Sequence, residues 1–156
     1  LFGCYTGVCY ADVVSITHEN LYTDENGALW LKYRRKKNEL RVSVKLLPEA
    51  VALIEKYHSE DRDTLFPLLH WPNLRRHMKA LAALAGIKDD LCYHQARHSF
   101  ASLITLEAGV PIETISRMLG HSDISTTQVY ARVSPKKLFE DMDKFIETTQ
   151  DFKLTL

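Results

Sequence analysis

After residue 46 the spacing of apolar residues changes from a period of two to spacings of three and four, and this change limits the possible folds. Residues 40–46 alternate between apolar and polar side chains, as a strand with one buried face does. Residues 28–33 predict a partner strand, with the basic residues 34–39 at the hairpin tip. From Pro48 onward the spacing is helical. We therefore expect an α+β fold that is mainly α, with a small antiparallel β-hairpin or sheet near the N-terminal third.

Local periodicity and stop residues predict the helices. A short helix is expected at 11–17, and further helices at 48–58, 72–85, 94–108, 111–119, 125–131 and from 134 to about 149. Gly86, Gly109 and Gly120 are natural C-terminal stops. In the helix at 72–85, one apolar stripe should face a core: Leu74, Met78, Leu81 and Ala85.

Composition indicates one globular domain that covers residues 1–156. The chain has 156 residues, of which 46% are hydrophobic and 26% charged. A core can form at this length without disulfides or a structural metal. The three cysteines, Cys4, Cys9 and Cys92, are irregularly spaced, as expected for reduced thiols. Because no apolar run is long enough to span a bilayer and no basic segment precedes one, we expect a cytoplasmic protein.

Charge is balanced overall but unevenly distributed. Lys and Arg number 20, as do Asp and Glu. Residues 32–45 hold seven of the cations with Glu39 as the only acid, and residues 75–88 form a second acid-free basic stretch. Acids gather at 60–63 and after residue 139. The basic stretches are either solvated surface or one face that binds DNA phosphates, and composition alone leaves both open.

Two short motifs carry candidate chemistry. His94 and Arg97 are three residues apart, on one face of the expected helix and near its N-terminus, where backbone N–H groups favour anions. A guanidinium can hold two phosphate oxygens at once. A His and an Arg at this spacing are a weak signal alone. The second motif, in which Leu119-Gly120-His121 is followed by Tyr130, makes the combination far more specific.

The sequence resembles the catalytic domain of the tyrosine recombinases, or phage-type integrases, over nearly its whole length. The matching segments occur in the family's order: Tyr5-Thr6-Gly7, Lys37-Asn38 in the basic hairpin, residues 94–101, Leu119-Gly120-His121, and Tyr130. The resemblance implies cleavage and rejoining of DNA strands. A tyrosine hydroxyl would attack a DNA phosphate and leave a 3′-phosphotyrosyl link and a free 5′-hydroxyl. No metal or nucleotide cofactor is implied.

The resemblance also implies a role for each matching residue. Tyr130 would be the nucleophile and Arg97 a phosphate clamp whose loss slows the reaction with little change in stability. His94 and His121 would bind the phosphate or manage protons. Lys37 would protonate the departing 5′-oxygen; Lys36 is the alternative, and Lys37 is preferred because it matches the family's Lys-Thr pair, with Asn38 in place of the threonine. Asp12 would support the site, and the expected DNA contacts are Arg34, Arg35, Lys36, Arg75 and Arg76.

One position departs from the family pattern. An arginine usually follows Thr-Gly by two residues, and here Cys9 stands in that place. A thiol cannot replace a bidentate cation, and the loss of one transition-state donor typically costs about 3 kcal/mol, or roughly a hundred- to a thousandfold in rate. Either the chain belongs to a branch of mobile-element integrases that tolerates the change, or another arginine such as Arg34 or Arg35 reaches the phosphate, or this copy is catalytically weak.

Other interpretations compete with this one. The helices on either side of Gly109 could form a helix-turn-helix-like DNA-binding regulator, although Arg117 is the only base-reading candidate on the second. An inactive integrase relic is a further alternative. His94 and His98 have a spacing that metal ligands use, but the segment lacks the glutamate of a zinc protease, so we expect no metal site and a structural His98.

The resemblance also bears on partners. Double-stranded DNA is the expected partner, and family members assemble as a synaptic tetramer. The N-terminal DNA-clamp domain of the family is absent from this sequence, so we expect a fragment that is a monomer or weak dimer. The broad apolar stripe of the last helix is a candidate contact: Leu138, Phe139, Met142, Phe145 and Ile146.

Overall fold

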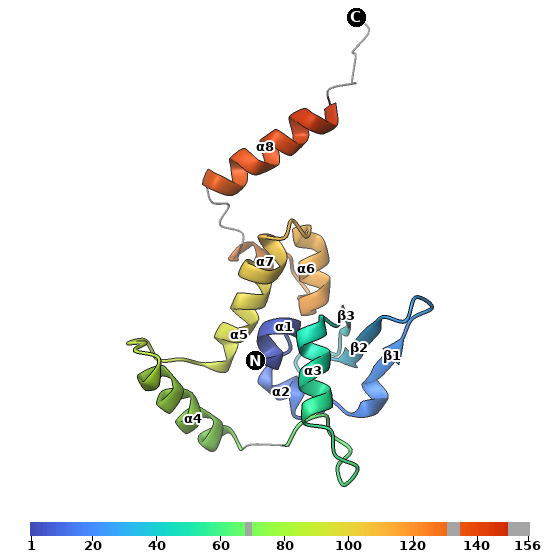
Figure 1. Ribbon diagram of the computed structural model, residues 1–156, viewed down its shortest axis with the longest axis vertical. Helices are drawn as coiled ribbons and strands as arrows, with labels where there is room; N and C mark the ends of the chain where they lie inside the picture. The colour runs from blue at the N-terminus through green and yellow to red at the C-terminus, as the bar shows by residue number, and fades with distance from the viewer. Residues whose placement is uncertain (68–69, 131–134, 150–156) are drawn as a thin grey trace, which may run out of the picture.

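The computed structural model describes residues 1–67, 70–130 and 135–149 and confirms a mainly helical fold with one small antiparallel sheet (Figure 1). The N-terminal third contains α1 (Phe2–Thr6), α2 (Tyr10–Val13), the 3₁₀ helix η1 (His18–Asn20), β1 (Leu21–Thr23), β2 (Leu29–Arg34) and β3 (Arg41–Lys45). The remainder contains α3 (Pro48–Lys56), α4 (Trp71–Leu84), α5 (Tyr93–Ser99), the π-helical segment η2 (Phe100–Leu106), α6 (Ile112–Leu119), α7 (Ser125–Gln128) and α8 (Pro135–Thr149).

The sheet confirms the expected hairpin and adds a third strand. Its order is β1-β2-β3, with both pairings antiparallel and Leu31 opposite Val44. Because side chains alternate across a strand, one face buries Leu31, Tyr33, Val42 and Val44 while the other presents the polar residues. The short β1 was not expected, since three residues are too few to show a period.

The hydrophobic core contains buried side chains from α1, α3, η2 and α6 and from the inner face of the sheet. Helix α1 lies against α3, α5 and η2, and α6 packs on both η2 and β3. Phe100, Ile115 and Leu119 are fully buried where these elements meet. The C-terminal end of α6 is therefore held between α1 and the β2–β3 hairpin.

The helix expected at 11–17 is longer than the observed one, because α2 covers only Tyr10–Val13. Helix α1, at Phe2–Thr6, was not expected, and it ends at Gly7 in the left-handed region with φ 68°. A Cβ at Gly7 would lie 2.7 Å from side-chain carbons of Leu119 and Phe100, so only glycine permits both this turn and the close approach of α6.

The helix expected at 94–108 is α-helical only in its first half. From Phe100 the turns widen, and Val110 N–H donates to the carbonyl of Thr105 at 3.0 Å, a π-type bond. The Thr105 hydroxyl is 2.8 Å from the carbonyl of Ala101 and 3.0 Å from that of Phe100 and binds both. This side-chain bonding to the backbone accompanies the change of helix type.

Helices α4 and α8 lie away from the body of the molecule in Figure 1. The expected inward stripe of α4 is wrong in its C-terminal half, because Leu81 is 61% exposed and Ala82 is buried instead. The apolar stripe of α8 is exposed as well. Ala131 and Ser134, which belonged to expected helix ends, lie outside the described residues. Among the residues that the structure describes, no helix is long and apolar enough to cross a membrane.

Candidate active site

Arg97 lies on α5 and is buried beneath the ends of two other helices. The helix begins after Cys92, whose backbone N–H donates to the Gln95 side chain at 2.7 Å. The Arg97 guanidinium donates to the carbonyl of Gly7 at 2.7 Å and to the carbonyl of Leu119. Its residue exposure is 1%, and this burial lowers its pKa below the ordinary value. Arg97 thus connects α1, α5 and α6 at one point.

Arg35 directly follows β2, at the start of the loop of the β2–β3 hairpin, and is also buried. Its Nε lies 3.5 Å from the Asp12 carboxylate, and Nη1 donates to the Gly120 carbonyl at 2.9 Å. Nη2 lies 3.4 Å from the Sγ of Cys9. Asp12 also accepts from the backbone N–H of Lys36 at 2.9 Å. Arg35, which was expected either among the DNA contacts or in place of the missing arginine, is therefore buried against Cys9.

The hairpin tip is attached to the end of α6. The Asn38 side chain donates to the Gly120 carbonyl at 3.1 Å. Gly120 has φ 61°, and a Cβ there would be 2.5 Å from Arg35 Cδ and Val42 Cγ2, so glycine is required for this contact. Lys37, the expected general acid, is exposed at the tip next to Asn38.

Three histidines and Tyr130 lie together. His121 follows Gly120 directly, and its Nδ1 lies 2.8 Å from the hydroxyl of Thr127 in α7. The Tyr130 ring stacks on His121 with centroids 6.3 Å apart and meets the edge of His98 at 4.4 Å. His98 in turn contacts His94, one helical turn earlier. His98 was expected to be structural, and the structure places it in contact with Tyr130 and on the same face of α5 as His94.

Electrostatic effects link these groups. Burial lowers the pKa of His121 to about 4, and the cations Arg97 and Arg35 add to the effect. Burial, the neighbouring His98 and these arginines also lower the pKa of His94. Lys37 lowers the pKa of both histidines. At neutral pH both imidazoles are therefore uncharged beside two fixed guanidinium groups.

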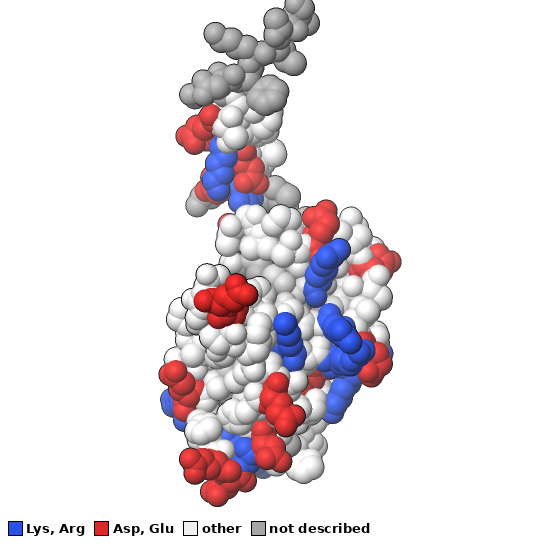
Figure 2. Space-filling model, turned by 90° about the vertical axis from the view of Figure 1, so that its right-hand side faces the viewer, with Lys and Arg blue, Asp and Glu red and all other residues white. Residues whose placement is uncertain are grey.

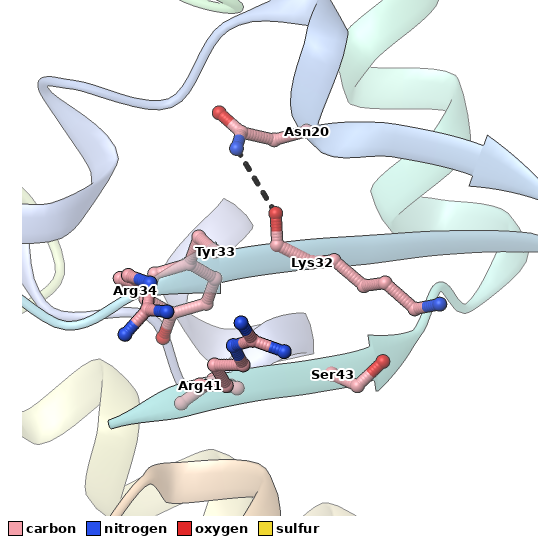
Figure 3. Close-up of a pocket in the computed structure, with 7 residues that line it drawn as sticks. Asn20, Lys32, Tyr33, Arg34, Arg41 and Ser43 are labelled. Carbon is pink, nitrogen blue, oxygen red and sulfur yellow. Dashed lines mark hydrogen bonds between the residues drawn. The ribbon is translucent and has the colours of Figure 1, made fainter. Parts of the chain in front are cut away.

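The outward face of the hairpin is basic. Figure 2, which views the right-hand side of Figure 1, shows Lys and Arg side chains gathered on it. Register and exposure assign this face, here called the basic sheet face, to Lys32, Arg34, Arg41 and Lys45. Three of these cations line a cavity of about 540 Å³ (Figure 3), in which Asn20 donates to the backbone carbonyl of Lys32 at 3.0 Å.

Not every expected residue joins the cluster. Arg75 and Arg76 are exposed on α4, away from α5–α7 in Figure 1. Within residues 1–67, 70–130 and 135–149, no three His, Cys, Asp or Glu side chains are grouped as metal ligands would be. The described cluster can instead supply two guanidinium groups, neutral imidazoles and a phenol at one place.

Comparisons with known proteins show similarity in sequence and in fold. Residues 2–137 match the sequence profile of the Phage integrase family. The tyrosine recombinase XerD of Lacticaseibacillus casei is 32% identical over 147 residues, which cover 85% of this chain and 48% of that protein. The crystal structure of XerA recombinase is 25% identical with a TM-score of 0.70, over 91% of this chain and 54% of that chain. The catalytic domain of bacteriophage HP1 integrase shares the fold, with a TM-score of 0.65 at 20% identity, over 97% of this chain and 77% of that one. The chain spans about half the length of the XerD and XerA proteins it matches.

Proposed function

The chain belongs to the phage integrase family, and we propose that residues 1–156 are the catalytic domain of a site-specific DNA recombinase that breaks and rejoins DNA through a phosphotyrosine. The observation that carries this proposal is the meeting of Tyr130 with His121 and His98 beside the Arg97 guanidinium. These residues come from three segments that are separate in sequence. A tyrosine that only packs against its neighbours would not require two histidines and a guanidinium around it.

Arg97 binds the scissile phosphate. Each terminal nitrogen of a guanidinium carries two N–H groups, and the carbonyls of Gly7 and Leu119 take one from each nitrogen. The second N–H of each nitrogen can donate to a non-bridging phosphate oxygen. Because the carbonyls hold the guanidinium rigidly, it needs no reorganisation when negative charge develops in the transition state.

Tyr130 attacks the phosphorus, and a neutral histidine accepts its proton. The oxygen of Tyr130 forms a bond to phosphorus while the bond to the 5′-oxygen breaks, so one phosphodiester replaces another. His121 is uncharged at pH 7, since its pKa is about 4 in the chain alone. A phosphate bound between the arginines would offset their positive charge and raise this pKa, so that the ring can take the phenolic proton. The contact with Thr127 fixes the orientation of the ring.

Lys37 gives a proton to the departing 5′-oxygen. The Asn38 contact to Gly120 holds the hairpin tip next to His121. The exposed Lys37 side chain, on the neighbouring residue, can then reach a phosphate bound at Arg97. We prefer Lys37 to Lys36 because the charge of Lys37 lowers the pKa of both His94 and His121, as expected for a side chain near the site. The backbone N–H of Lys36 donates to Asp12, so that contact supports the hairpin.

The basic sheet face and the α4 cations Arg75 and Arg76 bind the DNA backbone on either side of the scissile phosphate. Phosphate contacts position a duplex without reading its sequence. We expect no metal to take part, because the buried guanidinium groups supply the positive charge that a metal would. Within the full assembly, the exposed apolar stripe of α8 contacts a neighbouring subunit of a tetramer.

Covalent trapping tests the proposal. The probe is a pool of duplexes of random sequence, nicked so that the fragment released by cleavage diffuses away and the adduct persists. The wild-type chain should yield adducts that survive denaturation, and Tyr130→Phe should yield none. Tyr57, an exposed tyrosine at the end of α3, provides the matched control, and Tyr57→Phe should react as the wild type does.

The outcome also separates the alternatives. DNA binding with no adduct from the wild type at any duplex in the pool would indicate a DNA-binding regulator or an inactive relic, and would overturn the proposal. Adducts that persist in Tyr130→Phe would show that another residue is the nucleophile. Cleavage in the presence of a chelator should equal cleavage without it.

A further inference from the structure

The position of Cys9 leaves the proposed active site one cation short of the family pattern, and the structure shows what lies there instead. The Cys9 thiol accepts from Nη2 of Arg35 at 3.4 Å. Arg35 comes from the hairpin, 26 residues further along the chain. A guanidinium thus occupies the neighbourhood of residue 9, although residue 9 does not supply it.

Arg35 and Arg97 are held in the same way and at neighbouring points. Arg97 donates to the carbonyl of Leu119, and Arg35 to the carbonyl of Gly120, the next peptide unit. These carbonyls belong to the two residues that precede His121. The two guanidinium groups therefore flank the start of the segment that leads to Tyr130.

Two buried cations at such a place repel each other unless an anion joins them. Arg35 lowers the pKa of Arg97, in addition to the larger effect of burial, which is the sign of this repulsion. Asp12 offers one negative charge, but its carboxylate is shared between Arg35 and the backbone N–H of Lys36. The remaining acceptors of both arginines are neutral. A phosphate between the two guanidinium groups would remove the repulsion.

A buried hydroxyl in the same region supports this reading. The Tyr33 oxygen has no hydrogen-bond partner among the described residues, and Tyr33 is only 8% exposed. Burial and the nearby Asp12 carboxylate raise the pKa of Tyr33, while Arg97 and Arg35 act in the opposite direction. An unpaired hydroxyl beside two arginines is a donor that an anion can use.

We propose that Arg35 supplies from the β2–β3 hairpin the phosphate-binding guanidinium that the family places at the position of Cys9. The proposal rests on the proposed recombinase function and deepens it. Arg35 would be a catalytic residue that, with Arg97, holds the two non-bridging oxygens of the scissile phosphate. The small Cys9 side chain leaves room for the Arg35 guanidinium. Glycine at position 120 is also required, since a Cβ there would lie 2.5 Å from the Cδ of Arg35.

The test compares variants on the duplex that the wild-type chain cleaves, so the wild-type adduct is the reference. Arg35→Ala should slow adduct formation roughly a hundred- to a thousandfold. Arg35→Lys keeps the charge but not the two-pronged geometry, and should recover only part of the rate. Arg62 is the matched control, since its guanidinium is also held by backbone carbonyls, in the loop after α3. Arg62→Ala should lower stability and leave the rate per folded molecule unchanged.

A duplex whose scissile group is uncharged distinguishes a phosphate-binding arginine from one that only supports the fold. In a methylphosphonate linkage a methyl group replaces one charged oxygen, so the reaction depends less on a cation at this position. The ratio of wild-type to Arg35→Ala rates should then fall to within about tenfold. A ratio as large as that on the ordinary phosphodiester would show that Arg35 acts only through the fold, and would overturn the proposal.

Restoring the arginine at residue 9 gives an independent measurement. Cys9→Arg combined with Arg35→Ala should regain at least about tenfold of the rate that Arg35→Ala loses, and circular dichroism checks that each variant is folded. An Arg35→Ala rate equal to that of the wild type would overturn the proposal while leaving the proposed function intact. A wild-type chain that forms no adduct would instead refute the proposed function.

Discussion

Replacing Arg97 with alanine should affect stability as well as catalysis. Arg97 is 1% exposed, and its guanidinium donates to the carbonyls of Gly7 and Leu119, which lie at the ends of different helices. Hydrogen bonds from a charged donor contribute about 1.5–3 kcal/mol each, so losing both removes roughly 3–6 kcal/mol. The variant also avoids burying a cation, which offsets part of the loss. We expect a net decrease of about 2–4 kcal/mol in the free energy of unfolding.

Urea unfolding followed by circular dichroism measures this change. A domain with the usual stability of about 5–15 kcal/mol stays mostly folded after such a loss, with its midpoint lowered by about 1–2 M. Arg117, exposed on α6, is the control, and Arg117→Ala should change the free energy by less than about 0.5 kcal/mol. If Arg97→Ala also stays within about 0.5 kcal/mol of the wild type, the two carbonyl bonds do not hold the guanidinium as described.

Three further predictions follow from the site. Lys37→Ala should cleave an ordinary duplex far more slowly than the wild type does. The two rates should be similar when sulfur replaces the departing 5′-oxygen, because a thiolate leaves without a proton. Equal defects on both substrates would show that Lys37 is not the acid. The unfolded chain binds a proton at His121 near pH 6.5, and the folded chain binds it only near pH 4. The free energy of unfolding should therefore decrease as pH falls from 6.5 to 4, and the decrease should be shallower for His121→Gln. DNA affinity measured by fluorescence anisotropy should fall steeply with salt despite the zero net charge, because the basic sheet face displaces counterions; a flat response would contradict that role.

The fold could be predicted wherever a single segment shows its own period. The alternation at 40–46 fixed β3 because one face is buried against α6, and Gly120 ended α6 as expected. The strand β1 and the π-helical turns after Phe100 could not be predicted, since the first depends on pairing with β2 and the second on widened turns in which Thr105 binds two carbonyls.

Some residues of the site could be predicted from the sequence, and other contacts could not. Spacing and family resemblance selected His121 and Tyr130, which the structure places in contact. The sequence treated Arg97 as a clamp alone, whereas its buried bonds to two helix ends give it a structural role too. The contact of Arg35 with Cys9 depends on how the hairpin packs against α2 and α6, and no local pattern encodes that packing.

The attachment site of the DNA tests the proposed chemistry most directly. Mass spectrometry of the trapped adduct, after digestion with nuclease and protease, should find a nucleotide joined through a 3′-phosphate to Tyr130 and a free 5′-hydroxyl on the released strand. A nucleotide on any other residue, or a link through a 5′-phosphate, would contradict the assignment of Tyr130 as the nucleophile in this site.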